Sequence, residues 1–380
     1  MKAISACSVL VFALLLSIAG CGGSSTPTPP CTGSNCPPTS SSDYLFESSN
    51  SQISAFQVDS TTGALLATLT PVAGPQSAGG IVVTSTNFLY LSDFVNNTVY
   101  AFSVDNTSGA LTAVSGSPFT VGTGQGAGGL ATDPAGKFLF VAESNTSQVA
   151  AFTINSTGQL TKVAGSPFAA GLFPVEAAVD PSGKFLYVSN NQDALGSISG
   201  YTINSSTGVL TPIPGSPFST LVNGGPVGLT VHPNGKFLYV AMAGTGVPSD
   251  HIVAESIDTT TGALSPITGS PFTTGTEPTW VAINPAGTFL YSANVSDNDV
   301  SAFSVNANTG TLSQVSGSPF AAGSGPFFLV INSSGAVLFA ANELTTGIPA
   351  FTIGSSGALT TAAPIQGSGG GTGLAIVHHP

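Results

Sequence analysis

The amino-acid sequence predicts an all-β fold made of seven copies of one unit, and three observations support this prediction. An aromatic-rich triplet such as Phe237-Leu238-Tyr239 recurs roughly every fifty residues, a period typical of propeller blades. Short apolar runs rich in Val, Ile, Phe and Tyr lie between Gly, Pro, Asn and Ser residues, which indicates strands rather than helices. The chain also ends with an additional copy of the strand that opens each unit, Gly373–His378. Four strands in each unit predict a seven-bladed β-propeller.

The fifth unit illustrates the order of the expected elements: a first strand at Val227–His232, a turn at Pro233–Gly235, a second strand at Lys236–Ala241, a third strand at Ile252–Ile257, and a fourth strand from Leu264. In every unit a turn that ends in glycine follows the third strand. Glycine accepts positive φ in a tight hairpin without a clash of its side chain. The triplets begin at Tyr44, Phe88, Phe138, Phe185, Phe237, Phe289 and Val337, and the turns end at Gly63, Gly109, Gly158, Gly208, Gly262, Gly310 and Gly357.

The two ends of the repeated region predict how the ring closes. No first strand precedes Tyr44, but the chain finishes with the additional copy at Gly373–His378. If this strand joins the first blade, no sheet edge of that blade stays open toward the axis. We therefore expect truncation after about residue 370 to be strongly destabilising.

Residues 1–20 have the features of an export signal, with Lys2 followed by a short apolar segment and small residues. The tetrapeptide Ile18-Ala19-Gly20-Cys21 matches the bacterial lipobox, which predicts a lipid-anchored protein acylated at Cys21. An ordinary cleaved signal with a chance cysteine is the alternative. Gly22 in place of Asp predicts sorting to the outer membrane if the host is Gram-negative.

Residues 21–42 contain the lipidated Cys21 and a segment rich in Ser, Thr and Pro, which predicts a disordered tether before a propeller at residues 43–380. Cys31 and Cys36 lie in this tether. An exported protein meets an oxidising environment, so we expect a small disulfide loop, with two free thiols as the alternative. The propeller itself contains no cysteine, so it must be stabilised by packing and ring closure.

The composition excludes some partners. The chain has five basic residues, all of them lysine, against seventeen Asp and Glu, and its formal net charge is −12. Nucleic acids and heavily phosphorylated ligands bind through cationic side chains, so both are disfavoured. We expect a monomeric propeller that requires no cofactor.

The phrase Pro-x-Gly-Lys-Phe-Leu-Tyr-Val at Pro181–Val188 and Pro233–Val240, with Ser301–Val305 and the Thr-Gly-x-Leu turns, resembles the lactonase-type seven-bladed propellers. That family includes a class of 6-phosphogluconolactonases and muconate-lactonising enzymes, and it grades into surface proteins with Tyr-Val-Thr-Asn repeats, which Tyr187–Asn190 resembles. The resemblance implies Arg, His and Glu in a central cleft. This chain has no Arg, so the catalytic set of the family does not transfer and a phosphorylated lactone is disfavoured.

Candidate functional residues gather at the face where the first strands begin, which we call the top face. Counting back four residues from the polar residue that ends each first strand gives one position per blade, which we call the ring position. It holds Gly79, Gly129, Glu176, Gly228, Trp280 and Phe328. A carboxylate beside two aromatic rings resembles a platform for a sugar or lactone, with Glu176 and the nearby Glu277 as candidate general bases. The alternative is that Trp280 and Phe328 plug the channel as core residues.

Other acidic residues extend this prediction. Asp93 and Glu143 end second strands at the top face, so they are candidate ligand-binding residues in an acidic rim, with a merely solvated rim as the alternative. Asp297 and Asp299 flank Asn298 and are candidate Ca²⁺ ligands, although the longer calcium-loop pattern is missing. Glu255 occupies a third-strand slot that is aromatic in every other blade, where a carboxylate is costly.

Two functions fit these observations. The first is an envelope-tethered binding or scaffold propeller whose acidic top face meets a glycan or another envelope protein. The second is a lactonase-type hydrolase acting on an uncharged lactone, with Glu176 or Glu277 as general base. The lipid anchor, the tether and the missing arginine favour the first, because a shared fold does not establish a shared function.

Overall fold

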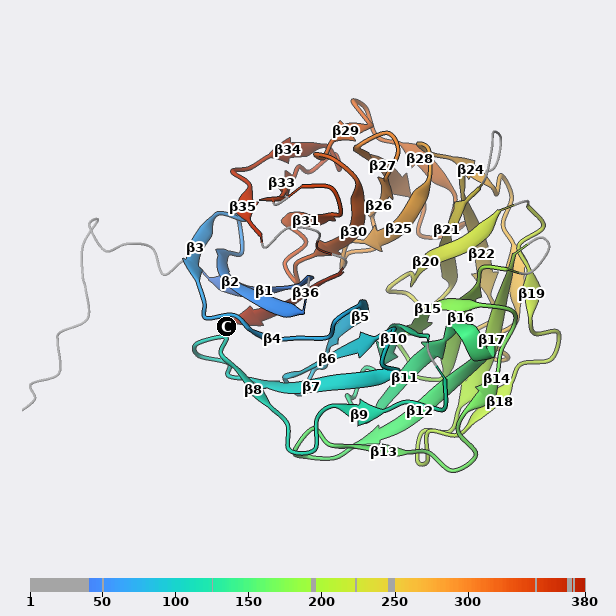
Figure 1. The fold of residues 1–380 in the computed structure, drawn as a ribbon. Coiled ribbons are helices and arrows are strands. Elements are labelled where there is room, and N and C mark those ends of the chain that lie inside the picture. Colours follow the sequence, from blue (N-terminus) through green and yellow to red (C-terminus); the bar gives the residue numbers. More distant parts are fainter. Residues whose placement is uncertain are drawn as a thin grey trace, which may run out of the picture. The chain divides into compact units, whose positions relative to one another are not determined.

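The computed structural model describes residues 41–49, 51–124, 126–192, 196–222, 224–244, 250–345, 347–367, 371 and 373–379. In this part of the chain, antiparallel sheets stand around a central axis as the seven blades of a propeller (Figure 1). This arrangement confirms the predicted fold. We number the blades in chain order, with blade 1 containing Tyr44. The described residues include no helix that is long and apolar enough to cross a membrane.

The second strand is the most buried strand of each blade, and the first strand lies between it and the axis. From blade 1 to blade 7, the first strands are β36 (Gly373–His379), β5 (Ala78–Val83), β10 (Ala127–Thr132), β15 (Pro174–Val179), β20 (Gly225–Val231), β25 (Pro278–Ile283) and β30 (Pro326–Ile331). The second strands are β1 (Ser42–Ser49), β6 (Phe88–Asp93), β11 (Phe138–Glu143), β16 (Phe185–Asn190), β21 (Phe237–Ala243), β26 (Phe289–Asn294) and β31 (Val337–Asn342).

The outer half of each blade is shorter. The third strands are β2 (Gln52–Asp59), β7 (Thr98–Val104), β12 (Gln148–Ile154), β17 (Ser197–Ile203), β22 (His251–Ile257), β27 (Asp299–Val305) and, in blade 7, β32 (Gly347–Ile348) with β33 (Ala350–Ile353). The fourth strands are β3 (Leu65–Thr68), β8 (Leu111–Ala113), β13 (Leu160–Lys162), β18 (Leu210–Pro212), β23 (Leu264–Pro266), β28 (Leu312–Gln314) and β34 (Leu359–Thr361). A 3₁₀ turn, η1 (Ser144–Thr146), follows β11.

A second short strand continues the outer edge and pairs with the same third strand. These strands are β4 (Val72–Ala73), β9 (Phe119–Thr120), β14 (Phe168–Ala169), β19 (Phe218–Ser219), β24 (Phe272–Thr273), β29 (Phe320–Ala321) and β35 (Ile365–Gln366). The Gly-Ser-Pro-Phe phrase therefore lies within the blade edge rather than in a connector between blades. The serine side chain of this phrase accepts a hydrogen bond from the third strand in place of a backbone carbonyl. In blade 2 the Ala101 N–H donates to Ser117 Oγ at 2.9 Å. Phe119 packs against the core that blades 2 and 3 share.

The predicted hairpin glycines join neighbouring blades. All seven have positive φ, between 68° at Gly109 and 83° at Gly357. In four of them, Gly158, Gly262, Gly310 and Gly357, the carbonyl accepts a hydrogen bond from the tyrosine of the preceding blade, as when the Tyr239 hydroxyl donates to Gly310 O at 2.9 Å. The same bond joins Tyr187 to Gly262 at 2.8 Å. The aromatic triplet is thus an interblade contact as well as a core strand.

The ring closes as the chain ends predict. Strand β36 pairs with β1 in continuous register from Ser42 opposite His379 to Ser48 opposite Gly373. At the far end of this pair, His378 Nδ1 lies 2.8 Å from Asp43 Oδ1. Asn332 of blade 7 donates to Asp43 Oδ2 at 3.0 Å. Side chains of blades 1 and 7 also share one apolar core, so first and last blades are packed like any other neighbours.

Candidate functional site

The ring position is set by a β-bulge near the start of the first strand. In blade 4, Pro174 pairs with Asn190 and Glu176 pairs with Ser189, so one residue is inserted between them. The same irregularity places Trp280 opposite Ala293 and Phe328 opposite Ala341. Bulges re-aim side chains and are frequent beside functional sites. The register therefore confirms that Glu176, Trp280 and Phe328 share one position of the repeat.

Blade 2 requires a correction to the predicted ring. Its ring residue is Gly80, which pairs with Ser92, and Gly79 is the bulge residue beside it. The first strand of this blade runs into Thr84, where blades 3 to 7 have Asp, His or Asn. The prediction relied on a strand-ending Asp, His or Asn, which blade 2 lacks, whereas counting back four residues from Thr84 gives Gly80. In blade 1 the ring residue is Gly373, opposite Ser48.

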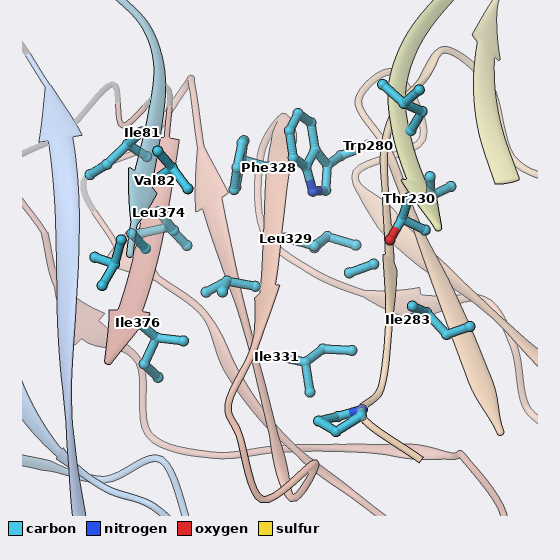
Figure 2. A pocket seen from close by; sticks show the side chains of 17 residues that line it. Ile81, Val82, Thr230, Trp280, Ile283, Phe328, Leu329, Ile331, Leu374 and Ile376 are labelled. Carbon is cyan, nitrogen blue, oxygen red and sulfur yellow. The ribbon is translucent and has the colours of Figure 1, made fainter. Parts of the chain in front are cut away.

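Trp280 and Phe328 form one aromatic stack between blades 6 and 7 (Figure 2). Their ring centroids are 3.7 Å apart and the ring planes differ by 29°. The indole also lies against the backbone of blade 5, because a Cβ atom added to Gly228 would lie 2.9 Å from Trp280 Cε3. A glycine at the ring position of blade 5 is therefore required for the indole to fit. Both rings line a cavity along the axis of the propeller.

Glu176 does not join this stack. Its carboxylate lies against blade 3, where a Cβ atom added to Gly129 would overlap it. Each large ring residue leans over the preceding blade, so Glu176 and Trp280 are directed at different neighbours. Glu176 accepts a hydrogen bond from the Ala177 N–H at 3.0 Å, and it does not line the cavity that the aromatic rings line.

The environment of Glu176 favours its neutral form. Burial raises the pKa of Glu176 to about 8, and the Ala177 hydrogen bond only partly opposes this shift. A carboxyl group with this pKa is mostly protonated at neutral pH. Its predicted role as a general base therefore requires a pH above neutrality, and that role remains a prediction.

Glu277 has the opposite character. It is exposed at the top face, directly before Pro278, and its oxygen Oε2 accepts a hydrogen bond from Ser296 Oγ at 2.6 Å. Its φ is 57°, in the left-handed region that costs a non-glycine residue energy. Blade 7 has a glycine at the same place, Gly325, with φ of 68°. Phe173 of blade 4 has φ of 54° at the same place, so the turn of the repeat imposes this conformation, and Glu277 and Phe173 adopt it at a cost that glycine does not bear.

Glu277 has an acidic neighbour that the sequence did not assign to the site. Burial raises the pKa of Glu343, and the charge of Glu277 raises it further. Glu343 follows the second strand of blade 7, so the two carboxylates come from adjacent blades.

Asp93 and Glu143 are enclosed rather than presented to solvent. Asp93 is fully buried and accepts hydrogen bonds from the backbone N–H groups of Gln76, Val95 and Asn96, each at 3.1 Å. Glu143 is 2% exposed, and burial raises its pKa, opposed by a hydrogen bond from Asn97 and the charge of Lys162. Both residues organise the loops around them, and ligand contact by them remains a prediction.

Asp297 and Asp299 are also engaged within the protein. Asp297 Oδ2 accepts a hydrogen bond from the Thr276 N–H at 2.6 Å, and Asp299 Oδ1 accepts one from Asn294 Nδ2 at 2.7 Å. Burial raises the pKa of Asp299, the Asn294 bond lowers it, and the charge of Asp297 raises it. Across the described ranges, no group of three or more His, Cys, Asp and Glu residues could hold a metal ion. The Ca²⁺ site remains a prediction that rests on two carboxylates.

Among the residues that the structure describes, the fully exposed acidic side chains of the top face belong to two blades. Glu277, Asp297 and Glu343 are exposed, whereas Glu47, Asp93, Glu143 and Glu176 are buried. The first three belong to blades 6 and 7, which also carry the aromatic stack. The predicted lipidation site Cys21 and the predicted disulfide between Cys31 and Cys36 lie outside the described residues. The candidate site is therefore Glu277 and Glu343 beside Trp280 and Phe328.

Comparison with known proteins identifies the family. The family model of lactonases with a seven-bladed β-propeller matches residues 38–166, 87–220 and 216–323. No curated protein matches the chain.

Solved structures share the fold. A candidate 6-phosphogluconolactonase from Bacteroides uniformis is 20% identical, with a TM-score of 0.77 over 89% of this chain and 100% of that one. The periplasmic gluconolactonase of Pseudomonas aeruginosa is 17% identical, with a TM-score of 0.72 over 90% of this chain and 100% of that one. At such identities the likeness concerns architecture alone. The matches of the family model extend from residue 38 to residue 323, most of the chain, and on this basis the protein belongs to the lactonase family of seven-bladed β-propellers.

Proposed function

We propose that this protein is an envelope-tethered binding propeller that holds a hydroxyl-rich ligand, such as a glycan, at the top face of blades 6 and 7. The observation that carries the proposal is Glu277, an exposed carboxylate kept in a strained backbone conformation and oriented by Ser296. Carboxylate oxygens accept hydrogen bonds from sugar hydroxyl groups, and an indole ring offers an apolar surface for the sugar ring.

The charge of the molecule agrees with a neutral ligand. The exposed acidic residues Glu277, Asp297 and Glu343 would repel a phosphate or carboxylate at this site. A net charge of −12 has the same effect at longer range. A ligand with hydroxyl groups and no negative charge meets neither penalty.

The tether belongs to the same proposal. Acylation of Cys21 would anchor the protein in the cell envelope, with the outer membrane as the destination in a Gram-negative host. The Ser/Thr/Pro-rich segment that follows would hold the propeller away from the lipid surface. Glycans and other envelope proteins would then be within reach of the top face.

A second function is supported by the family and by the pair of carboxylates. The raised pKa of Glu343 beside Glu277 gives a group that can donate a proton next to one that can accept it. Such a pair could activate water against an uncharged lactone and protonate the leaving alkoxide. Glu176 suits this role less well, because it is buried against Gly129 and its pKa is about 8.

One set of titrations distinguishes the two functions. Neutral hexasaccharides (maltohexaose, cellohexaose and chitohexaose) are titrated by calorimetry, and neutral and phosphorylated lactones are offered in a pH-stat. The proposal expects saturable binding of a saccharide, weakened at least tenfold in Glu277→Gln, with no lactone turnover above the blank. Asp105→Asn, on an exposed hairpin turn, is the matched control and should bind normally. Turnover of a neutral lactone that is lost in Glu277→Gln would replace the binding function with the hydrolytic one.

A further inference from the structure

The axis of the propeller contains a cavity of about 360 Å³ that the proposed glycan site does not use. Its walls come from the first strands β5, β20, β25, β30 and β36 of five blades (Figure 2). Trp280 and Phe328 lie side by side at one end, while Ile283 and Ile331 lie further along the same two strands. The aromatic stack therefore lines one side of this cavity at the end nearer the top face.

The side chains that line the cavity are mostly apolar, while backbone groups of the strands make a substantial part of the wall polar. Below the ring position, the residues two places further along the first strands are Val82, Thr230, Ala282 and Val330. They face the same side of their strands as the ring residues, because side chains alternate along a strand. Thr230 and the indole N–H of Trp280 are the polar groups of the lining side chains, and no lining residue carries a charge. The remaining polar atoms of the wall belong to the backbone of the strands.

Walls with mostly apolar side chains disfavour strongly polar and charged ligands. A charged group moved into such a space would lose its hydration without gaining a partner. Ligand sites of small molecules are typically cavities of this size with apolar walls and few polar groups. An uncharged apolar molecule would instead gain from leaving water.

The cavity is also long for its volume. Its lining on β25 and the following turn runs from Trp280 to Pro285. The three residue steps on β25, from Trp280 to Ile283, span about 10 Å at about 3.3 Å per residue, and the turn to Pro285 extends the lining beyond the strand. A compact ring system would leave much of this length empty, whereas an extended alkyl chain would follow it.

We propose that the axial cavity binds an uncharged molecule with an extended aliphatic chain, with its apolar end against the Trp280–Phe328 stack. This site shares the aromatic stack with the glycan site at the top face and differs from it in ligand chemistry and in the strands that line it. Its occupant contacts Trp280 from the cavity side, so binding alters the surroundings of the indole.

The chain provides its own reporter for the test, because Trp280 is its single tryptophan. The purified protein is titrated with 1-decanol while Trp280 emission is followed, and the melting temperature is measured at each concentration. A saturable change in emission with a rise in melting temperature is expected, since a ligand that binds the folded state stabilises it. Decanoate, the charged counterpart, should bind at least tenfold more weakly at pH 8.

Substitutions in the wall locate the binding. Thr230→Phe fills the middle of the cavity and should weaken decanol binding at least tenfold, whereas Thr230→Val keeps the volume and should bind at least as well as the parent. If Thr230→Phe does not fold, Ala282→Leu on the neighbouring blade fills the same layer and makes the same prediction. Equal binding by a folded filled variant, or a linear change in emission with a falling melting temperature, would overturn the proposal.

Discussion

Glu176 and Glu255 are carboxylates whose surroundings favour the neutral form. Glu255 is 4% exposed on β22, in register with Leu238 on one side and Pro266 on the other, and burial raises its pKa to about 7. The other blades have Phe or Tyr at this place, so the carboxylate interrupts an apolar layer. A folded-state pKa above the unfolded value means that the folded protein holds its proton more tightly. Stability from this source is present below the unfolded pKa and is lost as pH rises through the folded pKa.

Glu255→Gln tests this linkage. The loss should accumulate between about pH 4.5 and pH 7 and reach roughly 3 kcal/mol, at about 1.36 kcal/mol per pKa unit. The variant should therefore match the parent in urea unfolding at pH 4 and exceed its free energy of unfolding by roughly that amount at pH 8. Glu277→Gln, at an exposed site, is the control and should follow the pH dependence of the parent. The same difference in stability at both pH values would contradict the assignment.

The strained backbone at Glu277 allows stability and function to be separated. Glu277→Gly should raise the free energy of unfolding by about 1 kcal/mol, because glycine adopts positive φ without strain. The same variant should lose the binding or turnover assigned to this site. Thermal melting and the saccharide and lactone assays measure the two effects in one preparation. A variant that is both less stable and fully active would show that the glutamate has no role at the site.

The repeated element of this protein is a strand that also connects to the next blade. The second strand packs in its own blade while its tyrosine hydroxyl reaches the hairpin glycine of the following blade, at 2.9 Å for Tyr239 and 3.0 Å for Tyr291. Burial raises the pKa of Tyr239, so the phenol remains a hydrogen-bond donor throughout the physiological range. The aromatic triplet thus explains how the blades are held together without cysteine.

Tyr239→Phe removes one of these bonds without changing the packed ring. The carbonyl of Gly310 would lose its buried donor, which costs about 1–3 kcal/mol. Urea unfolding should show this loss. Tyr100→Phe, at a partly exposed tyrosine on β7, is the matched control and should change stability by less than about 0.5 kcal/mol. An equal effect of both substitutions would indicate that the interblade bond adds nothing.

The whole molecule depends on the pairing of its last strand with its first described strand. Strand β36 supplies the inner edge of blade 1, and Asn332 and His378 meet at Asp43 where the ring closes. Because every blade packs on two neighbours, a blade without its inner strand exposes apolar surface toward both the axis and blade 7.

Deletion of residues 371–380 should therefore abolish cooperative folding of the ring. Far-UV circular dichroism and thermal melting should show a broad transition, or none, together with aggregation. A chain that lacks residues 1–39 retains every strand and should melt cooperatively, which makes it the control. Cooperative melting of the C-terminal deletion near the parent temperature would contradict this account of closure.

The repeat, the number of blades, the hairpin glycines and the closing strand could all be predicted from the sequence. Each follows from local rules: a period of two in strands, the φ that glycine tolerates, and a strand count that leaves one copy over at the C-terminus. The interblade role of the tyrosine could not be predicted, because its partner Gly310 lies 71 residues away in the chain. The place of Gly-Ser-Pro-Phe in the blade edge could not be predicted either, because a serine hydroxyl there accepts the hydrogen bond that a backbone carbonyl would accept in a regular strand pair.

The sequence by itself determined which residue types stand at the ring position, and the register confirmed Glu176, Trp280 and Phe328 in it. Only the tertiary structure decided which of them meet. Ring residues lean over the preceding blade, so Phe328 stacks on Trp280 while Glu176 is buried against Gly129. Solvent exposure was decided in the same way, because it depends on how neighbouring blades cover a side chain. That is why the exposed carboxylates of the site are Glu277 and Glu343, whereas Asp93 and Glu143 are enclosed.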